Sequence, residues 1–317
     1  DAVTWYYEVY RMYPTLSVFL PNGDFAGIYL NGGNYNIIGK MALAGRNKKE
    51  TWDQWYTGRF DLHPMKGLSV KGDYSWNRYS TVQKFHRKEM TQTFPEGRDP
   101  YLVETPNYVR NYNSNNIYQA INVWAEYKKS FNDVHNLSLM AGYNQEEKTY
   151  ASTSYTMTDL YDNEMPISDL AINYKENEEG SDIWRVQGAF FRLNYDYRSK
   201  YLLEVNGRYD GSSKYAKHDR WAFFPSASVG WRISEEKFFK SLSKVVDNLK
   251  IRASIGALGN QITDGNHSFM SIISGKVLTN YMMDGKIVNG LNIPTLPSMV
   301  TWEKVITKDI GLDWSLF

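Results

Sequence analysis

The sequence predicts an all-β fold, a transmembrane antiparallel β-barrel of which about nine strands are present. Three observations support this prediction. Apolar and polar residues alternate with a period of two along most of the chain, as in strands with two different faces. Aromatic residues make up 15% of the chain, with 25 tyrosines and 10 tryptophans, which is typical of a membrane-interface belt. Short and long connections follow one another in turn, as in a barrel with one tight and one elaborated end.

The composition excludes several classes of protein. The formal net charge is +1, so no overall positive field attracts nucleic acid. The chain has no cysteine, which excludes disulfides, thiolate catalysis and cysteine metal sites. No run of about 18 apolar residues is present, so we expect no transmembrane helix. The mean hydropathy of -0.55 is compatible with transmembrane strands, because their alternating residues average out to a polar value.

The first four predicted strands form two hairpins. In "TWDQWYTGRFDL", Trp52, Tyr56 and Phe60 share one face, and charged residues dominate the other. The turn "HPMKG" ends the first strand, and "NDVHN" separates the third strand from the fourth. These strands are predicted over residues 51–62, 68–76, 117–131 and 137–144.

Five further strands and one helix are predicted in the second half of the chain. Alternation continues on both sides of a turn at residues 198–200. A helix is predicted over residues 234–248, because Ser234 can act as its N-cap before two glutamates. The strands are predicted over residues 189–197, 201–209, 224–233, 249–256 and 306–317.

Three long polar segments alternate with the tight turns. They lie near residues 84–116, 151–182 and 259–303, and we expect them to be extracellular loops. Soluble domains seldom contain connections longer than about 15 residues without secondary structure. Residues 1–50 fit an extracellular loop region that leads into such a barrel. Residues 51–317 are expected to form the barrel strands with these loops.

One face of the predicted strands suits lipid and the other suits water. A strand of about 12 residues is about 40 Å long and, tilted by about 40°, crosses about 30 Å of hydrocarbon. Aromatic rings near the strand ends predict an interfacial girdle of Tyr195, Tyr197, Tyr201, Tyr209, Trp231 and Trp314. The polar face is expected to line a wet lumen, with candidate ligand-binding residues Arg192, Asn194, Glu204, Asn206 and Arg208.

A soluble β-sandwich or barrel is the alternative, since it shows the same alternation with a dry core in place of lipid. The predicted strand length and the asymmetry of the connections favour the membrane barrel. Aromatic residues outside the strands, such as Trp5, Tyr6 and Tyr7, are either stacking platforms for a ligand or residues that pack the loops together.

Several segments resemble one known family and keep its order along the chain. They are "MKGLSVKGDYS", "FRLNYDYRSKYLLEVNGRYDGSSKY", "FPSASVGWRISEEKFF", "NLKIRASIGALGNQ" and "ITKDIGLDW". The motif residues are Asp210, Gly211, Ser212, Ser213, Phe224, Pro225, Ser226, Gly230, Trp231, Arg232, Gly259, Asn260 and Gln261. Over about residues 51–317, the chain resembles the barrel of the SusC/RagA-type TonB-dependent outer-membrane transporters of Bacteroidetes-like bacteria.

The resemblance implies a multi-pass barrel of about 22 strands in the bacterial outer membrane, plugged by an N-terminal domain. It also implies contact with TonB through a segment before the plug, and a SusD-like surface lipoprotein that covers the barrel. The implied ligands are oligosaccharides or oligopeptides. About nine strands cannot close a barrel of that width, and neither the plug nor the TonB-contacting segment is found. We therefore expect the chain to be an internal stretch of a larger transporter.

No combination of residues predicts catalysis, a cofactor or a metal site. The sequence has no nucleophile elbow, Walker loop or dinucleotide fingerprint. Its five histidines lack the spacing of a helical zinc site and are expected to be ordinary exposed residues. The segment "GNQITDGN" lacks the acidic residue of a calcium loop and is predicted as a turn. Asp196 and Glu204 are predicted as members of a structural charge ladder rather than a glycosidase pair.

The leading hypothesis is the import of large nutrients, energised through the Ton system as the resemblance implies, without enzyme activity. A second hypothesis is a soluble all-β carbohydrate-binding module. A third is a passive or structural outer-membrane barrel within an envelope complex.

Overall fold

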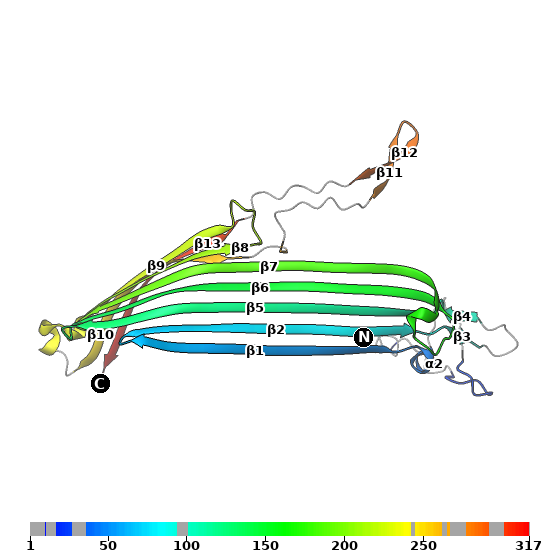
Figure 1. Ribbon diagram of the computed structural model, residues 1–317, viewed down its shortest axis with the longest axis horizontal. Helices are drawn as coiled ribbons and strands as arrows, with labels where there is room; N and C mark the ends of the chain where they lie inside the picture. The colour runs from blue at the N-terminus through cyan, green and yellow to red at the C-terminus, as the bar shows by residue number, and fades with distance from the viewer. Residues whose placement is uncertain are drawn as a thin grey trace. The chain divides into compact units, whose positions relative to one another are not determined.

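Nine strands form one antiparallel sheet in the computed structural model of the chain (Figure 1). Their order in the sheet is β1-β2-β5-β6-β7-β8-β9-β10-β13, so each strand pairs with the one that precedes it once two small hairpins are set aside. This arrangement confirms the predicted all-β fold and the number of strands. The structure describes residues 10, 17–26, 36–93, 101–241, 245–261, 265–266, 277–291 and 301–316.

The elements have the following bounds. The sheet contains β1 (Asn47–Met65), β2 (Leu68–Arg87), β5 (Tyr108–Phe131), β6 (His135–Leu160), β7 (Ala171–Tyr197), β8 (Tyr201–Ser212), β9 (Trp221–Arg232), β10 (Val246–Asn260) and β13 (Glu303–Leu316). The two hairpins pair β3 (Met90–Gln92) with β4 (Tyr101–Glu104), and β11 (Val277–Met283) with β12 (Lys286–Leu291). The helical segments are α2 (Ile37–Leu43) and the 3-10 segments η1 (Ser168–Leu170), η2 (Ile233–Glu235) and η3 (Lys237–Ser241).

The chain divides into two compact units. Unit 1 contains residues 1–53, 78–116 and 150–181, and unit 2 contains residues 54–77, 117–149 and 182–317. Strands β1, β2, β5, β6 and β7 contribute residues to both units, whereas β8, β9, β10 and β13 belong to unit 2 alone. All the residues predicted for the girdle, the lumen and the family motifs lie in unit 2.

Tight turns join successive strands at one end. Gly67, between β1 and β2, has a φ of +86°, which a residue without a Cβ adopts without strain. Residues 198–199, between β7 and β8, have φ angles of 52° and 55°. The backbone N–H of Ser199 donates to the Asp196 carboxylate at 2.7 Å, and this bond stabilises the turn. Asp196 therefore has a structural role in this turn.

At the other end, the strands extend much further than the sequence predicts. β5, β6 and β7 contain 24, 26 and 27 residues. The segment expected to be a loop at 151–182 is therefore strand except for residues 161–170, and the one at 84–116 includes the end of β2 and the start of β5. The first residues of β7, "AINYKENEEG", are mostly exposed whichever face they occupy. Such a strand has no apolar face, so it lacks the alternation by which strands are predicted.

The predicted helix over residues 234–248 is wrong. Of the residues described in this range, which leave out 242–244, those of η2 and η3 alone are helical, and β10 already begins at Val246. Glu236, which separates the two 3-10 segments, is extended, with φ -79° and ψ 148°. Its carboxylate binds side chains of the neighbouring strands, so these tertiary contacts outweigh the helix propensity of the segment.

One face of the sheet in unit 2 is apolar and exposed. Phe191 is 44% exposed, Leu203 is 37% exposed and Val229 is 55% exposed. A soluble sandwich would bury these side chains under a second sheet. A small buried cluster is formed by Tyr215, Ala222, Phe224 and Trp302. Among the described residues, no helix combines the length and the apolar composition needed to cross a bilayer.

Candidate ligand pocket on the polar face of unit 2

The strand register places the predicted lumen residues on one face of the sheet. Residues directly opposite each other in an antiparallel pair point to the same side. The register pairs are Arg192 with Asn206, Asn194 with Glu204, and Phe190 with Arg208. The next strand continues this face, because Ser226 and Ser228 of β9 lie opposite Asn206 and Glu204.

Hydrogen bonds link the polar side chains of this face across the strands. Arg192 Nε donates to Asn206 Oδ1 at 2.7 Å. Asn206 Nδ2 donates to Glu204 Oε1 at 2.7 Å and to Ser226 Oγ at 3.3 Å. The resulting chain of four side chains crosses three strands and fixes the orientation of each member.

A second linkage on the same face is an ion pair within β8. Arg208 donates to the two carboxylate oxygens of Asp210, with Nε at 3.1 Å and a terminal nitrogen at 2.9 Å. Asp210 is 9% exposed, so the pair satisfies a nearly buried carboxylate. Gly188 lies opposite Asp210, and a Cβ at residue 188 would be 1.9 Å from Asp210 Oδ1. Glycine therefore makes room for the carboxylate.

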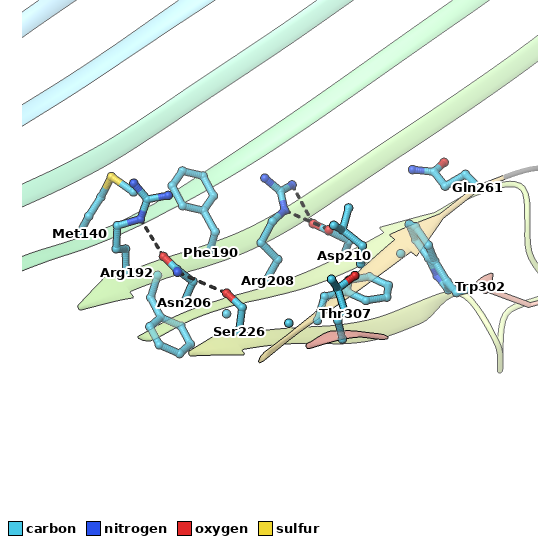
Figure 2. Close-up of a pocket in the computed structure, with 17 residues that line it drawn as sticks. Met140, Phe190, Arg192, Asn206, Arg208, Asp210, Ser226, Gln261, Trp302 and Thr307 are labelled. Carbon is cyan, nitrogen blue, oxygen red and sulfur yellow. Dashed lines mark hydrogen bonds and ion pairs between the residues drawn. The ribbon is translucent and has the colours of Figure 1, made fainter. Parts of the chain in front are cut away.

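A pocket of about 560 Å³ opens on this polar face (Figure 2). Arg192 and Phe190 contribute from β7, Asn206 and Arg208 from β8, and Ser226 from β9. Met140 of β6, residues of β10 and β13, and Gln261 and Trp302 complete the lining. Three of the residues predicted for the lumen, Arg192, Asn206 and Arg208, therefore line one pocket together with the motif residues Asp210, Phe224, Ser226, Gly259 and Gln261. Asn194 and Glu204 line an adjacent pocket of about 430 Å³.

Residues from separate motif segments meet in the pocket wall and beside it. Ser212 Oγ donates to Gln261 Oε1 at 3.0 Å. The Trp302 ring centroid lies 5.2 Å from that of Phe224 and 5.3 Å from that of Tyr215. We call Ser212, Tyr215, Phe224, Gln261 and Trp302 the motif cluster. Tyr215 and Ser212 are fully buried, so this cluster is a packed part of an otherwise accessible face.

The motif glycine at 259 is explained by the same packing. A Cβ at residue 259 would lie 2.1 Å from Phe224 Cζ, so any other residue would displace the ring. Asn260, next to it, accepts a hydrogen bond from the Tyr215 hydroxyl through its backbone oxygen at 3.3 Å. Asn260 also donates to Glu303 at 3.2 Å.

The remaining motif residues lie along β8 and β9 or at their ends. Ser213 Oγ accepts the backbone N–H of Arg185 at 2.8 Å. Arg232 donates its backbone N–H to the Lys200 oxygen at 2.8 Å. The other three are placed opposite partners in the register, Gly211 with Trp221, Pro225 with Gly207, and Gly230 with Leu202.

The predicted girdle residues lie on the other face or at the strand ends. Tyr201 and Trp231 are opposite each other, and both donate to the Glu236 carboxylate, at 2.7 Å and 3.3 Å. Tyr209 stacks on Trp221 with ring centroids 5.0 Å apart. Trp314, on β13, is 65% exposed.

The other two predicted girdle residues contact a histidine. The Tyr195 hydroxyl lies 2.7 Å from Nδ1 of His135, and the Tyr197 ring centroid lies 4.8 Å from that of His135.

The exposure of another histidine, His86, differs from its prediction. His86 is only 6% exposed, so the expectation of ordinary exposed histidines is wrong for this residue.

Sequence reasoning misses Trp302 and Glu236. Trp302 lies at the end of the segment expected to be a loop, and Glu236 lies in the segment expected to be a helix. The sequence offers one signal, and only for Trp302: it is a large aromatic residue four positions before the alternation resumes at residue 306. The partners of these side chains come from distant parts of the chain, so neither contact follows from local pattern.

The chemistry available in the pocket is hydrogen bonding and charge pairing. Its lining combines arginine, asparagine and hydroxyl groups with aromatic rings. In the described part of the chain, no group of three His, Asp or Glu side chains lies close enough to hold a metal ion.

Comparison with known proteins gives a family match over almost the whole chain. The family described as "TonB dependent receptor-like, beta-barrel" matches residues 4–316. TonB-dependent receptor P3 of Formosa agariphila is 27% identical over 98% of this chain and 30% of its own. TonB-dependent receptor SusC of Bacteroides thetaiotaomicron is 32% identical over 39% of this chain and 12% of its own. The chain thus spans less than a third of the length of these relatives.

Solved structures show a similar fold. A chain of the RagAB peptide transporter matches with a TM-score of 0.71 and 21% identity, over 93% of this chain and 32% of that chain. A chain of the RagAB peptide importer in the "closed-closed" state matches with a TM-score of 0.72 and 20% identity, over 94% of this chain and 32% of that chain. At this identity the similarity concerns the fold alone.

Proposed function

The chain belongs to the TonB dependent receptor-like β-barrel family, and on this basis we propose that its strands form part of the wall of an outer-membrane importer of large nutrients. The family is one of outer-membrane receptors and transporters rather than enzymes. The activity proposed for this protein is transport without covalent chemistry.

The observation that carries the proposal is the contrast between the two faces of the sheet in unit 2. Phe191, Leu203 and Val229 are exposed on one face, where lipid would cover them. On the other face, Arg192, Asn206 and their partners form a hydrogen-bonded polar wall that suits a wet lumen. A transport wall needs both faces, since it must separate a polar path from hydrocarbon.

We also propose positions relative to the membrane for the girdle residues and for the long connecting segments. Tyr201, Tyr209, Trp231 and Trp314 would sit at the membrane interfaces together with Tyr195 and Tyr197. Residues 1–50 and the segments near 84–116, 151–182 and 259–303 would lie on the extracellular side. There they would contact the ligand and a SusD-like surface lipoprotein.

Energy and ligand class are further parts of the proposal. The work of import would come from the Ton system through an N-terminal plug domain of the full-length protein. The ligand is an oligosaccharide or an oligopeptide. The resemblance to SusC and to the fold of the RagAB transporter supports both ligand classes and does not favour either one.

The test is uptake by cells that carry or lack the full-length gene. We expect cells with the gene to accumulate a labelled oligosaccharide or oligopeptide, and a protonophore or deletion of TonB to abolish the accumulation. Uptake that survives both treatments would favour a passive barrel. Extraction of the full-length protein as a soluble monomer without detergent would contradict the membrane assignment.

A further inference from the structure

We propose that the pocket around Arg192 binds a carboxylate group of the imported ligand, an inference that rests on the proposed transport function. The starting observation is the charge of the pocket lining. Its charged side chains are Arg192, Arg208 and Asp210. Arg208 and Asp210 neutralise each other in a bidentate ion pair. Arg192 has no ion pair among the described residues, so it is the one charged residue of the pocket lining without a direct ionic partner; the nearest acidic group of its network, Glu204, binds Asn206 and lines the adjacent pocket.

Several other cations of the polar face in unit 2 have an acidic partner. Lys71 pairs with Asp61 at 3.4 Å. Lys250 and Arg252 pair with aspartates of β13 at 3.4–3.5 Å. A paired charge exerts little field on a ligand, so among the charged side chains that line this pocket Arg192 is the one available to an acidic group.

The guanidinium of Arg192 is held in a fixed orientation. Its Nε donates to Asn206 Oδ1, and Asn206 is itself held by Glu204 and Ser226. This bond uses one N–H donor and leaves the two terminal nitrogens for another acceptor. Because the neighbours fix the plane of the guanidinium, a ligand loses less entropy when it binds there than at a free side chain.

The surroundings leave room for a small acidic group. Ser226 and Gly256 lie opposite each other and present little side-chain volume in the pocket of about 560 Å³. The Phe190 ring closes another side, and Arg208 lies 5.6 Å from its centroid (Figure 2). An apolar wall beside a cation lowers the local dielectric constant and strengthens charge pairing.

These features select a carboxylate. A planar guanidinium with two free terminal nitrogens matches the two oxygens of a carboxylate in a bidentate pair. Arg192 remains exposed, so the pair would be weak enough to release the ligand, as a transport path requires. The carboxylate can belong to an acidic oligopeptide or to a uronic acid of an oligosaccharide.

The experiment offers both sources to the purified full-length protein in detergent. One pool contains random tetrapeptides, and the other contains short oligosaccharides built from hexoses and hexuronic acids. Retained molecules are eluted and identified by mass spectrometry, and the ratio of acidic to neutral molecules is measured. We expect the protein to enrich acidic members of one pool, and Arg192→Gln to lower that ratio about tenfold.

A matched control removes the same charge elsewhere on β7. Arg185→Gln also removes one positive charge, but from a residue outside the pocket that pairs with Glu147. We expect it to leave the acidic-to-neutral ratio within about twofold of the original, and Arg192→Lys to restore part of the enrichment. Thermal unfolding of each variant verifies that the barrel is folded.

Two negative results are distinguishable. If molecules are retained without acidic enrichment, or if Arg185→Gln lowers the ratio as much as Arg192→Gln, the carboxylate site is wrong and the import function stands. If nothing is retained from either pool, the proposed function fails and the site fails with it.

Discussion

Gly188 shows how a residue without a side chain makes space for an ion pair on the polar face. It lies opposite Asp210, whose carboxylate occupies the space that a Cβ would need. The carboxylate in turn holds Arg208 at the edge of the pocket. Glycine at this strand position therefore allows an ion pair that a larger residue would push aside.

We predict that Gly188→Ala destabilises the full-length protein by about 1–3 kcal/mol, because the new methyl group overlaps with Asp210 Oδ1. Thermal unfolding in detergent measures the change. Gly58→Ala is the control, since a Cβ at residue 58 meets no atom within 4 Å. Equal stability of the two variants would contradict this role for Gly188.

His86 gives a prediction about pH. Burial, with a further contribution from the charge of Lys88, lowers the pKa of His86 below its ordinary value of 6.5. Its Nε2 is buried and has no hydrogen-bond partner among the described residues. The unfolded chain therefore takes up a proton more readily than the folded chain below about pH 6.5.

We expect unit 1 to be stable above about pH 6.5 and to lose stability as the pH falls from there toward the lowered pKa. Proteolysis of the segment near 84–116 at pH 7.5 and pH 5.5 measures the opening rate around His86. His86→Leu should reduce the difference between the two rates. If the His86→Leu variant shows the same difference between the two rates, titratable groups other than His86 cause the pH dependence.

At the scale of the element, Glu236 connects the 3-10 segments after β9 to two residues of the proposed aromatic girdle. Tyr201 and Trp231 donate to one of its carboxylate oxygens, and Lys200 donates to the other at 3.1 Å. The hydrogen bond from Tyr201 and then the one from Lys200 hold the pKa of Glu236 below its ordinary value. The charged form of Glu236 thus positions two girdle rings at once.

We predict that Glu236→Gln lowers the melting temperature of the full-length protein and broadens its tryptophan emission, because Trp231 and Tyr201 lose a charged acceptor. Glu235→Gln makes the same change in charge one residue away, where no side-chain bond is formed among the described residues. Similar melting temperatures for the two variants would contradict the prediction.

The motif cluster acts between elements that are distant in the sequence. Trp302 packs against Tyr215 and Phe224, and its Nε1 donates to the Arg220 backbone oxygen at 2.8 Å. The cluster therefore joins the start of β13 to the connection between β8 and β9. This packing gives a physical reason for the motif segments to occur together.

We predict that Trp302→Ala costs about 3–5 kcal/mol of stability, the usual range for removing a buried large aromatic side chain. Chemical unfolding of the full-length protein in detergent measures it. Trp314→Ala, at a site that is 65% exposed, should cost much less. A larger loss at Trp314 would show that the girdle and not the cluster stabilises β13.

At the scale of the whole molecule, the two faces of the sheet require different solvents. The apolar face exposes residues such as Leu203, while the polar face contains Ser228 on the neighbouring strand. A charge placed on the lipid face of a barrel costs about 2–4 kcal/mol at mid-depth, whereas the same charge exposed on a soluble protein costs less than about 0.5 kcal/mol.

We therefore predict that Leu203→Arg strongly reduces the folded fraction of the full-length protein in outer membranes, while Ser228→Arg reduces it little. The fraction is measured as the band that changes mobility on heating before gel electrophoresis. Equal folded fractions would favour the soluble all-β alternative over the membrane barrel.

Much of the fold could be predicted from the sequence because the period of two is a local property. It gives nine strands, their tight turns and the side of each residue, as with Arg192 and Asn206 on one face and Leu203 on the other. The prediction fails for the long ends of β5, β6 and β7, which lack an apolar face. It also fails at residues 234–248, where Glu236 binds Tyr201 instead of continuing a helix.

The candidate site, like the fold, could be predicted from the sequence only in part. The sequence by itself determined which side chains face the polar side, because alternation along a strand decides that without reference to any other strand. Only the tertiary structure decided that Arg192 has no ion pair with any described residue, that Gly188 makes room for Asp210, and that Trp302 closes the motif cluster. The physical reason is that pairing and packing depend on the register between strands, and the register joins residues that no local pattern relates.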